Sequence, residues 1–217
     1  MKRFAIIGLS SFGYYLSRYF SEYDTEVLSI DNDESKVDKV KEYVKKAVVA
    51  DAKDKEALKN LGVDEMDAAV VTLGDDINSS ILVTLYLKEM GVREIIAKAV
   101  NEDHAKILNL IGATRIIFPE RDMAKRVAHT LRKTSLLDYV YLSEGFSMIE
   151  MAPPSSWNGK TLAELKIRNK YNAQVIMIKE IIPENLVMVP GPNHIIKESD
   201  ILVMVGPEQD LEKLEKL

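Results

Sequence analysis

A glycine turn near the N-terminus constrains the fold of this chain more than any other feature. An unbroken apolar run at residues 4–7 precedes the sequence Gly-Leu-Ser-Ser-Phe-Gly at 8–13, and apolar residues then recur at helical spacing. A second apolar run follows at 27–30 and ends on Asp31. This order predicts a buried strand, a tight turn, a helix and a second buried strand that ends in an acid.

The same order has a physical logic for nucleotide binding. The first glycine lets the chain turn sharply out of the strand, and the last lets the helix pack close to the sheet. The start of the helix offers unpaired N–H groups and a partial positive charge to a phosphate. We therefore expect a phosphate-binding turn made of Gly8, Ser10, Ser11, Phe12 and Gly13.

Asp31, followed by Asn32, lies eighteen positions after Gly13, where an acid would accept hydrogen bonds from a ribose diol. Its charge would repel a 2′-phosphate, so the site is expected to prefer NAD-like or plain adenosine nucleotides over NADP. Ser10 replaces the middle glycine of the G-x-G-x-x-G pattern and brings a Cβ, although its hydroxyl could donate a hydrogen bond. The alternative is a strand-to-helix turn that binds nothing.

Apolar runs and helical segments continue to alternate as far as residue 118. Further strands are expected at 47–50, 68–73, 95–97 and 116–118, with helices at 34–45, 54–61, 77–90 and 102–110 between them. Six short strands separated by helices predict an α/β fold with a Rossmann-like, doubly wound parallel sheet. In such a sheet a ligand lies across the carboxyl ends of the strands.

Position after a strand selects further candidate site residues, namely Asp51, Thr72, Leu73, Gly74 and Lys98. Lys98 could neutralise a phosphate, and its alternative is an ordinary solvated lysine. Asp75 and Asp76 are expected to cap a helix rather than to hold a metal or to act as an acid–base pair, because carboxylates are common at helix starts.

The pattern changes after residue 118. A helix opened by Pro119 carries an apolar stripe of Met123, Val127 and Leu131, and more apolar residues follow at 136–140. This surface predicts a dimer interface, with packing on its own domain as the alternative. From about residue 145 the sequence predicts a small α+β domain, so the expected division is 1–134, a linker at 135–144, and 145–217.

Composition excludes several classes of protein. The 217 residues include no cysteine, which rules out disulfides, thiolate zinc sites and cysteine nucleophiles. The formal net charge of −5 argues against nucleic acid or an anionic membrane as the main partner. Neither a signal peptide nor a membrane-spanning run is recognisable, so a cytoplasmic protein is expected.

The whole chain resembles the RCK (regulator of potassium conductance) family, which includes KtrA- and TrkA-type subunits of bacterial potassium uptake systems. In the first domain the resemblance rests on IIGLSSFG at 6–13, Asp31, VVADA at 48–52, SSILVTLYLKEMG at 79–91, AKAVN at 97–101 and IGATRIIFPERDM at 111–123. In the second it rests on NGKTLAEL at 158–165, AQVIMIK at 173–179 and the segment from Pro192 to Gly206.

The resemblance implies a non-enzymatic gating subunit. Such proteins dimerise through the helix after the sixth strand and assemble into rings, commonly octamers, on the cytoplasmic side of a KtrB- or TrkH-like potassium transporter subunit. Adenine nucleotides (ATP, ADP or AMP) or NAD(H) bind the first domain and change the shape of the ring. The implied roles are adenine binding for Asp51 and Ala52, phosphate binding for Lys98, and cation or phosphate binding at the dimer interface for Glu120.

Two further implications concern specificity. Ser11 stands where family members that respond to ATP carry arginine, so the discrimination of ATP from ADP or AMP is in question. Some members also bind cyclic di-AMP in the second domain, and the matching positions here are Leu162, Ala163, Arg168, Gln174 and Pro190.

Two other functions compete with gating: an NAD-dependent oxidoreductase, which would share the first domain, and a nucleotide-binding scaffold without a membrane partner. Hydride transfer needs a substrate pocket and a proton donor within reach of the reacting atom. The three histidines, His104, His129 and His194, have no partner acid at useful spacing. A membrane pull-down would identify the scaffold.

The oxidoreductase alternative has a direct test. Because no catalytic set accompanies the predicted cofactor turn, we expect purified protein to leave NADH absorbance unchanged in the presence of a panel of small carbonyl compounds. Turnover of any of these compounds would instead support the enzyme.

Overall fold

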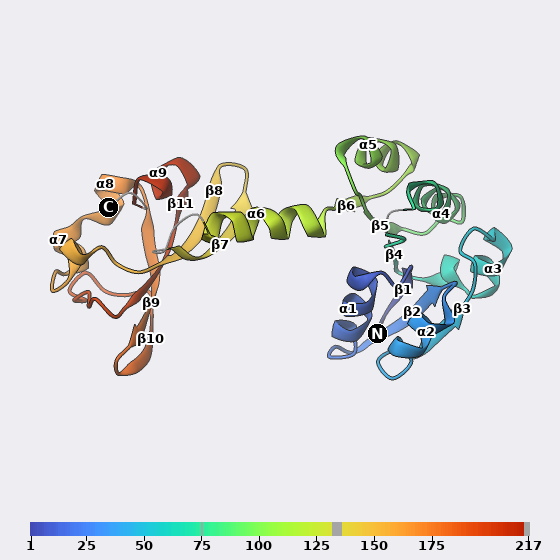
Figure 1. Cartoon of the computed structure of the whole chain (residues 1–217), viewed down its shortest axis with the longest axis horizontal. Helices are drawn as coiled ribbons and strands as arrows, with labels where there is room; N and C mark the ends of the chain where they lie inside the picture. Colours follow the sequence, from blue (N-terminus) through green and yellow to red (C-terminus); the bar gives the residue numbers. More distant parts are fainter. Residues whose placement is uncertain (75, 132–135, 215–217) are drawn as a thin grey trace. The chain divides into compact units, whose positions relative to one another are not determined.

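The computed structural model describes residues 1–74, 76–131 and 136–214, and the chain divides into two compact units, Met1–Pro119 and Glu120–Leu217 (Figure 1). The division falls between Pro119 and Glu120, at the start of the helix Pro119–Leu131. Within the described ranges, no helix combines the length and the apolar character that a bilayer crossing requires.

The first unit alternates strands and helices in the predicted order. Its elements are β1 (Lys2–Ile7), α1 (Ser11–Phe20), β2 (Thr25–Asp31), α2 (Glu34–Val40), β3 (Lys46–Val49), α3 (Lys55–Asn60), a 3₁₀ turn (Val63–Glu65), β4 (Ala68–Val71), α4 (Ile77–Glu89), β5 (Glu94–Lys98), α5 (Glu102–Ile111) and β6 (Arg115–Ile117). The described strands pair in parallel in the order β3-β2-β1-β4-β5-β6. The predicted doubly wound parallel sheet is confirmed.

Strand β1 is apolar at successive positions, with no alternation of apolar and polar residues, because both of its faces are buried. Ala5 and Ile7 contact one core cluster, which includes Leu58 and Leu87 of the helices on that side, whereas Ile6 contacts another cluster with Val37. Successive side chains of a strand point to opposite faces, and here both faces are covered by helices. The carboxyl end of β1 is thereby held in the middle of the sheet, where a ligand site forms in folds of this type.

The turn after β1 packs tightly against the end of β4. The hydroxyl of Thr72, which is fully buried, donates a hydrogen bond of 2.5 Å to the carbonyl oxygen of Gly8. Gly8 has a φ of +93°, in the region that favours glycine. A Cβ at Gly13 would lie 2.5 Å from Thr72 Oγ1, so both glycines are needed for the close approach of turn and strand.

The second unit begins with α6 and continues as an antiparallel sheet with short helices. Its elements are α6 (Pro119–Leu131), β7 (Leu136–Ser143), β8 (Phe146–Met151), a 3₁₀ turn (Ser155–Trp157), α7 (Leu162–Leu165), α8 (Ile167–Tyr171), β9 (Gln174–Ile181), β10 (Glu184–Met188), β11 (Ile201–Pro207) and α9 (Glu208–Leu214). The described strands pair in the order β10-β9-β11-β8-β7, which confirms the small α+β domain. Thr161 and Glu164 form a capping box at the start of α7.

The stretch predicted as a linker, 135–144, forms strand β7 over most of its length. Residues of β7 pair antiparallel with β8, and the side chain of Tyr139 is buried with an exposed fraction of 3%. The apolar residues that made this linker unusual therefore belong to a sheet. The difference arises because strand pairing is a contact with β8 that local sequence spacing does not reveal.

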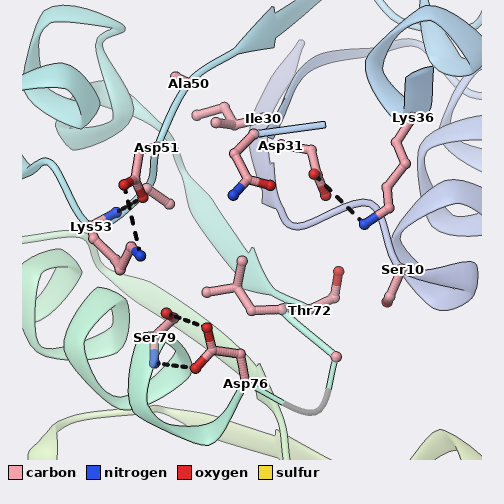
Figure 2. Close-up of a pocket in the computed structure, with 14 residues that line it drawn as sticks. Ser10, Ile30, Asp31, Lys36, Ala50, Asp51, Lys53, Thr72, Asp76 and Ser79 are labelled. Atoms are coloured by element: carbon pink, nitrogen blue, oxygen red, sulfur yellow. Dashed lines mark hydrogen bonds and ion pairs between the residues drawn. The ribbon is translucent and has the colours of Figure 1, made fainter. Parts of the chain in front are cut away.

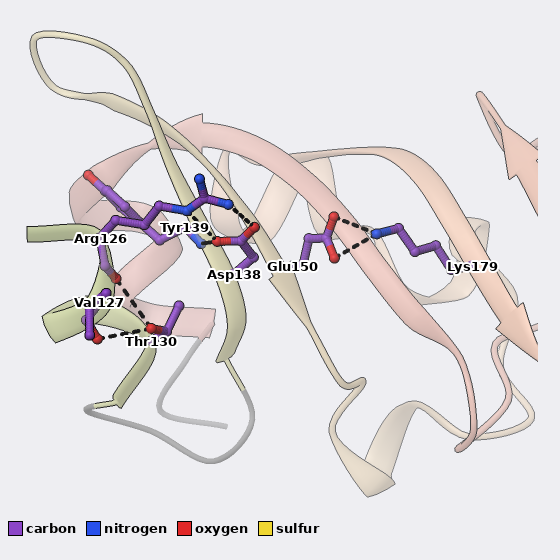
Figure 3. A network of polar contacts seen from close by, with 7 residues as sticks. All are labelled: Arg126, Val127, Thr130, Asp138, Tyr139, Glu150 and Lys179. Atoms are coloured by element: carbon purple, nitrogen blue, oxygen red, sulfur yellow. Dashed lines mark hydrogen bonds and ion pairs between the residues drawn. The ribbon is translucent and has the colours of Figure 1, made fainter. Parts of the chain in front are cut away.

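Polar contacts attach α6 to this sheet (Figure 3). Arg126 donates to both carboxylate oxygens of Asp138 at 2.9 and 2.5 Å, and this pairing lowers the pKa of Asp138. The ring of His129 stacks on Tyr139 with centroids 4.1 Å apart. Burial and a hydrogen bond to Glu208 raise the pKa of Tyr139 to about 12, so its hydroxyl stays protonated. These contacts explain why α6 groups with the second unit.

The apolar stripe of α6 remains open to solvent in the single chain. Met123, Val127 and Leu131 have exposed fractions of 54%, 45% and 80%. The second unit itself therefore does not cover this stripe.

The glycine contact at Thr72 gives a stability prediction. Replacement of Gly13 by alanine should lower the free energy of unfolding by about 1–3 kcal/mol, because the added methyl group overpacks the turn. Urea unfolding followed by far-UV circular dichroism measures the change. Gly191→Ala is the matched control, since a Cβ there meets nothing within 4 Å. Equal unfolding midpoints for the two variants would contradict the close packing.

Candidate functional site

A pocket of about 320 Å³ lies at the carboxyl ends of the strands in the first unit (Figure 2). This volume is at the lower end of the range for small-molecule sites. Eight of the residues predicted from the sequence line it: Ser10, Asp31, Asn32, Asp51, Ala52, Thr72, Leu73 and Gly74. The structure therefore brings together the ends of β1, β2, β3 and β4, as expected for a parallel sheet.

Asp31 connects the end of β2 to the turn after β1. Its Oδ2 accepts a hydrogen bond of 2.6 Å from the Leu9 N–H, and its Oδ1 accepts one of 2.9 Å from the Asp33 N–H. Lys36 Nζ lies 3.7 Å from Asp31 Oδ1. Each carboxylate oxygen can accept more than one hydrogen bond, so Asp31 keeps acceptor capacity toward the pocket that it lines.

The start of α1 faces the pocket without a side-chain cap. Ser10 is the N-cap residue, yet its side chain makes no capping hydrogen bond, and the first turn contains no acid. The Ser10 hydroxyl oxygen is buried and has no hydrogen-bond partner among the described residues. An anion placed here would meet helix N–H groups and a free hydroxyl, which is the arrangement that phosphates favour.

The opposite side of the pocket combines acids with a lysine. Asp76 accepts hydrogen bonds from the Ser79 hydroxyl at 2.6 Å and from the Ser79 N–H at 3.0 Å. These bonds, with a smaller contribution from the charge of Lys53, lower the pKa of Asp76. Asp76 thus caps α4, as predicted, and is ionised at neutral pH; Asp75 lies outside the described residues. Lys53 Nζ lies 3.8 Å from Asp51 Oδ2.

Several predicted site residues lie outside the pocket lining. Gly8 and Gly13 shape the turn, Phe12 is half-buried in α1, and Ser11 lines a neighbouring cleft. Lys98, at the end of β5, is 8% exposed and is not among the lining residues. Glu120 belongs to the second unit.

The pocket also contains residues that sequence reasoning missed as site residues: Ile30, Lys36, Ala50, Lys53, Asp76 and Ser79. A signal was present for the two lysines, because each follows a strand-end acid within five positions. Ile30 and Ala50 precede such acids. Ser79 belongs to the pocket lining and hydrogen-bonds to Asp76, a contact that only the structure shows.

The pocket offers no histidine or tyrosine among its described lining residues. His104 is 2% exposed within the first unit, and burial lowers its pKa. Its Nδ1 accepts a hydrogen bond of 3.4 Å from the Val100 N–H, which fits a neutral core histidine. In the described part of the chain, no group of three or more acidic or histidine side chains is placed to hold a metal ion.

A second pocket, of about 440 Å³, lies within the second unit. The five positions implied for a cyclic dinucleotide all line it: Leu162, Ala163, Arg168, Gln174 and Pro190. Lys166 lines it as well, so two cations share the pocket with apolar side chains. Such a combination suits a ligand with flat aromatic bases and a phosphate.

The fold and the pocket define an α/β protein of the Rossmann type with a second, smaller domain. Residues 4–119 match the TrkA-N domain, and residues 146–217 match the TrkA-C domain. The chain is 41% identical to Ktr system potassium uptake protein C of Bacillus subtilis (strain 168), over 99% of this chain and 96% of that protein. It is 36% identical to Ktr system potassium uptake protein A of the same organism, with the same coverage.

Solved structures share the fold. The crystal structure of the GsuK RCK domain superposes with a TM-score of 0.55 at 22% identity, over 99% of this chain and 46% of the other. The GsuK channel bound to NAD gives a TM-score of 0.56 at 22% identity, over 100% and 38%. This chain thus spans less than half of those solved chains. With both domain matches and the full-length relatives, the chain belongs to the RCK family of TrkA-N/TrkA-C proteins.

The contacts of Asp31 predict a cost for its neutralisation. Asp31→Asn should lower the free energy of unfolding by about 1–3 kcal/mol, because an amide NH₂ cannot accept one of the two backbone N–H bonds. Asp33→Asn is the control, because Asp33 is exposed and asparagine caps a helix as well as aspartate. Urea unfolding of both variants measures the difference, and an unchanged Asp31→Asn midpoint would refute the structural role of Asp31.

Proposed function

We propose that this protein is a nucleotide-binding gating subunit of a bacterial potassium uptake system. One observation carries the proposal: the strand ends of the first unit build a pocket around Asp31 and the uncapped start of α1, in a chain that matches Ktr proteins over almost its full length. The ligand is an adenine nucleotide, either ATP, ADP or AMP, or NAD(H).

The nucleotide lies with its ribose at Asp31 and its phosphates at the start of α1. Asp31 accepts hydrogen bonds from the ribose diol, and the Ser10 hydroxyl donates to a phosphate. Asp51 and Ala52 lie on the adenine side. Lys98 and Glu120 keep their predicted roles toward phosphate or cation, and they act when two chains meet.

Gating requires that the ligand distinguish two shapes of the assembly. A nucleotide shifts the population only by its difference in affinity for those shapes. The exposed stripe of α6, made of Met123, Val127 and Leu131, pairs two chains into a dimer, and dimers build a ring, most simply an octamer. The ring acts on a KtrB- or TrkH-like membrane subunit.

The protein is a regulator and not an enzyme. The pocket lining supports binding, because Asp31 and Asp51 pair with lysines, Asp76 accepts hydrogen bonds from Ser79, and the described lining contains no histidine. Its location is the cytoplasm, at the inner face of the cell membrane through its partner.

The pocket of the second unit binds a cyclic dinucleotide of the cyclic di-AMP type. Arg168 and Lys166 supply charge for its phosphates, and Leu162, Ala163 and Pro190 supply apolar contacts for its bases. This second ligand gives the assembly an input that is separate from the pocket of the first unit.

Calorimetric titration of the purified full chain with ATP, ADP, AMP and NADH tests the first site. We expect binding tighter than millimolar for at least one of them. Asp31→Asn should weaken that binding about tenfold or more, because a charge-assisted hydrogen bond to the ribose is lost.

Asp33→Asn again serves as the control, since it removes the same charge two residues away and leaves the pocket lining intact. Circular dichroism at the titration temperature verifies that each variant is folded. Absence of any binding below millimolar concentration would refute the nucleotide switch, and equal affinity of wild type and Asp31→Asn would refute the ribose contact.

A further inference from the structure

A second cleft of the first unit, of about 540 Å³, opens between α1 and α2. The side chains that give it chemical character are Ser10, Ser11, Tyr14, Tyr15, Lys36 and Lys39. The two tyrosines come from α1 and the two lysines from α2. The positions assigned to adenine and to the ribose diol do not line this cleft, whereas Ser10 and Ser11 of the phosphate-binding turn do.

The cleft continues the nucleotide pocket on the side of the ribose. Ser10 and Lys36 line both spaces. Lys36 Nζ lies 3.7 Å from Asp31 Oδ1, and Figure 2 shows its side chain reaching toward that carboxylate from α2. A ribose held at Asp31 therefore has Lys36 beside its hydroxyls and the cleft beyond them.

The two spaces differ in charge. The nucleotide pocket is lined by three aspartates and two lysines, whereas the described lining of the cleft has two lysines and no carboxylate. Lys36 is partly neutralised by Asp31, but Lys39, one helical turn further on, has no ion-pair partner among the described residues. The cleft is thus the more favourable place for an additional anion.

We propose that this cleft binds a phosphate group carried on the ribose of the adenine nucleotide, so that the site accepts NADP(H)-type ligands. The proposal rests on the proposed function of the first unit and deepens it. In such a ligand Asp31 accepts a hydrogen bond only from the ribose hydroxyl that remains free. Lys36 pairs with both Asp31 and the added phosphate, and Lys39 supplies a further positive charge. Ser11 and the tyrosine hydroxyls offer hydrogen-bond donors to the remaining phosphate oxygens.

This inference reverses an expectation drawn from the sequence. Asp31 by itself predicts repulsion of a 2′-phosphate. The structure places Lys36 against that carboxylate and Lys39 in the adjoining cleft, so a 2′-phosphate would meet two lysines as well as Asp31.

Calorimetric titration of the full chain with NADH and NADPH tests the proposal. We expect wild-type protein to bind NADPH at least as tightly as NADH. Lys39→Gln should weaken NADPH binding about tenfold, because one charge-assisted contact is lost, and should leave NADH binding within about twofold. Added salt should weaken NADPH binding more than NADH binding, since exposed lysine contacts are screened.

Lys59→Gln is the matched control, because Lys59 is an exposed lysine of the same unit that lines neither space. It should leave both affinities unchanged. Binding of NADH with NADPH more than about tenfold weaker, or equal effects of Lys39→Gln on both nucleotides, would overturn this inference alone. Failure of both nucleotides to bind would overturn the dinucleotide site and this inference with it, while binding of ATP, ADP or AMP would still sustain the gating proposal.

Discussion

The pocket at the carboxyl ends of the strands depends on one close contact, in which the turn after β1 packs directly against the end of β4. The Thr72 hydroxyl reaches the Gly8 carbonyl oxygen, and no Cβ at Gly13 keeps the two apart. Because this contact holds the turn in place, the Leu9 N–H donates a hydrogen bond of 2.6 Å to Asp31. The start of α1 at Ser10 then lines the pocket. The positions of the Leu9 N–H and of the helix start at the pocket follow from this contact.

The charged side chains that line the pocket suit the binding of a polar ligand. Acids and lysines alternate around the pocket, with Lys36 near Asp31 and Lys53 near Asp51. Paired charges of this kind recognise hydroxyl and phosphate groups. Under our proposal, occupancy of the pocket changes the assembly through this recognition.

The two units have different tasks in this view. The first presents a pocket at strand ends, whereas the second carries α6, fastened by Arg126 to Asp138 and by His129 to Tyr139. A helix attached so firmly on one side can offer its apolar stripe to another chain without losing its own fold. The second pocket, with Arg168 and Lys166, gives this unit a ligand of its own under our proposal.

Much of the fold could be predicted because its signals are local. The glycine turn, the apolar runs and Asp31 at a strand end follow from turn chemistry and periodicity within a few residues. The tertiary structure alone decided that Lys36 faces Asp31, that Ser79 joins the pocket through Asp76, and that the predicted linker pairs with β8. Those contacts depend on side-chain reach and on pairing between distant segments, which no local pattern of residues encodes.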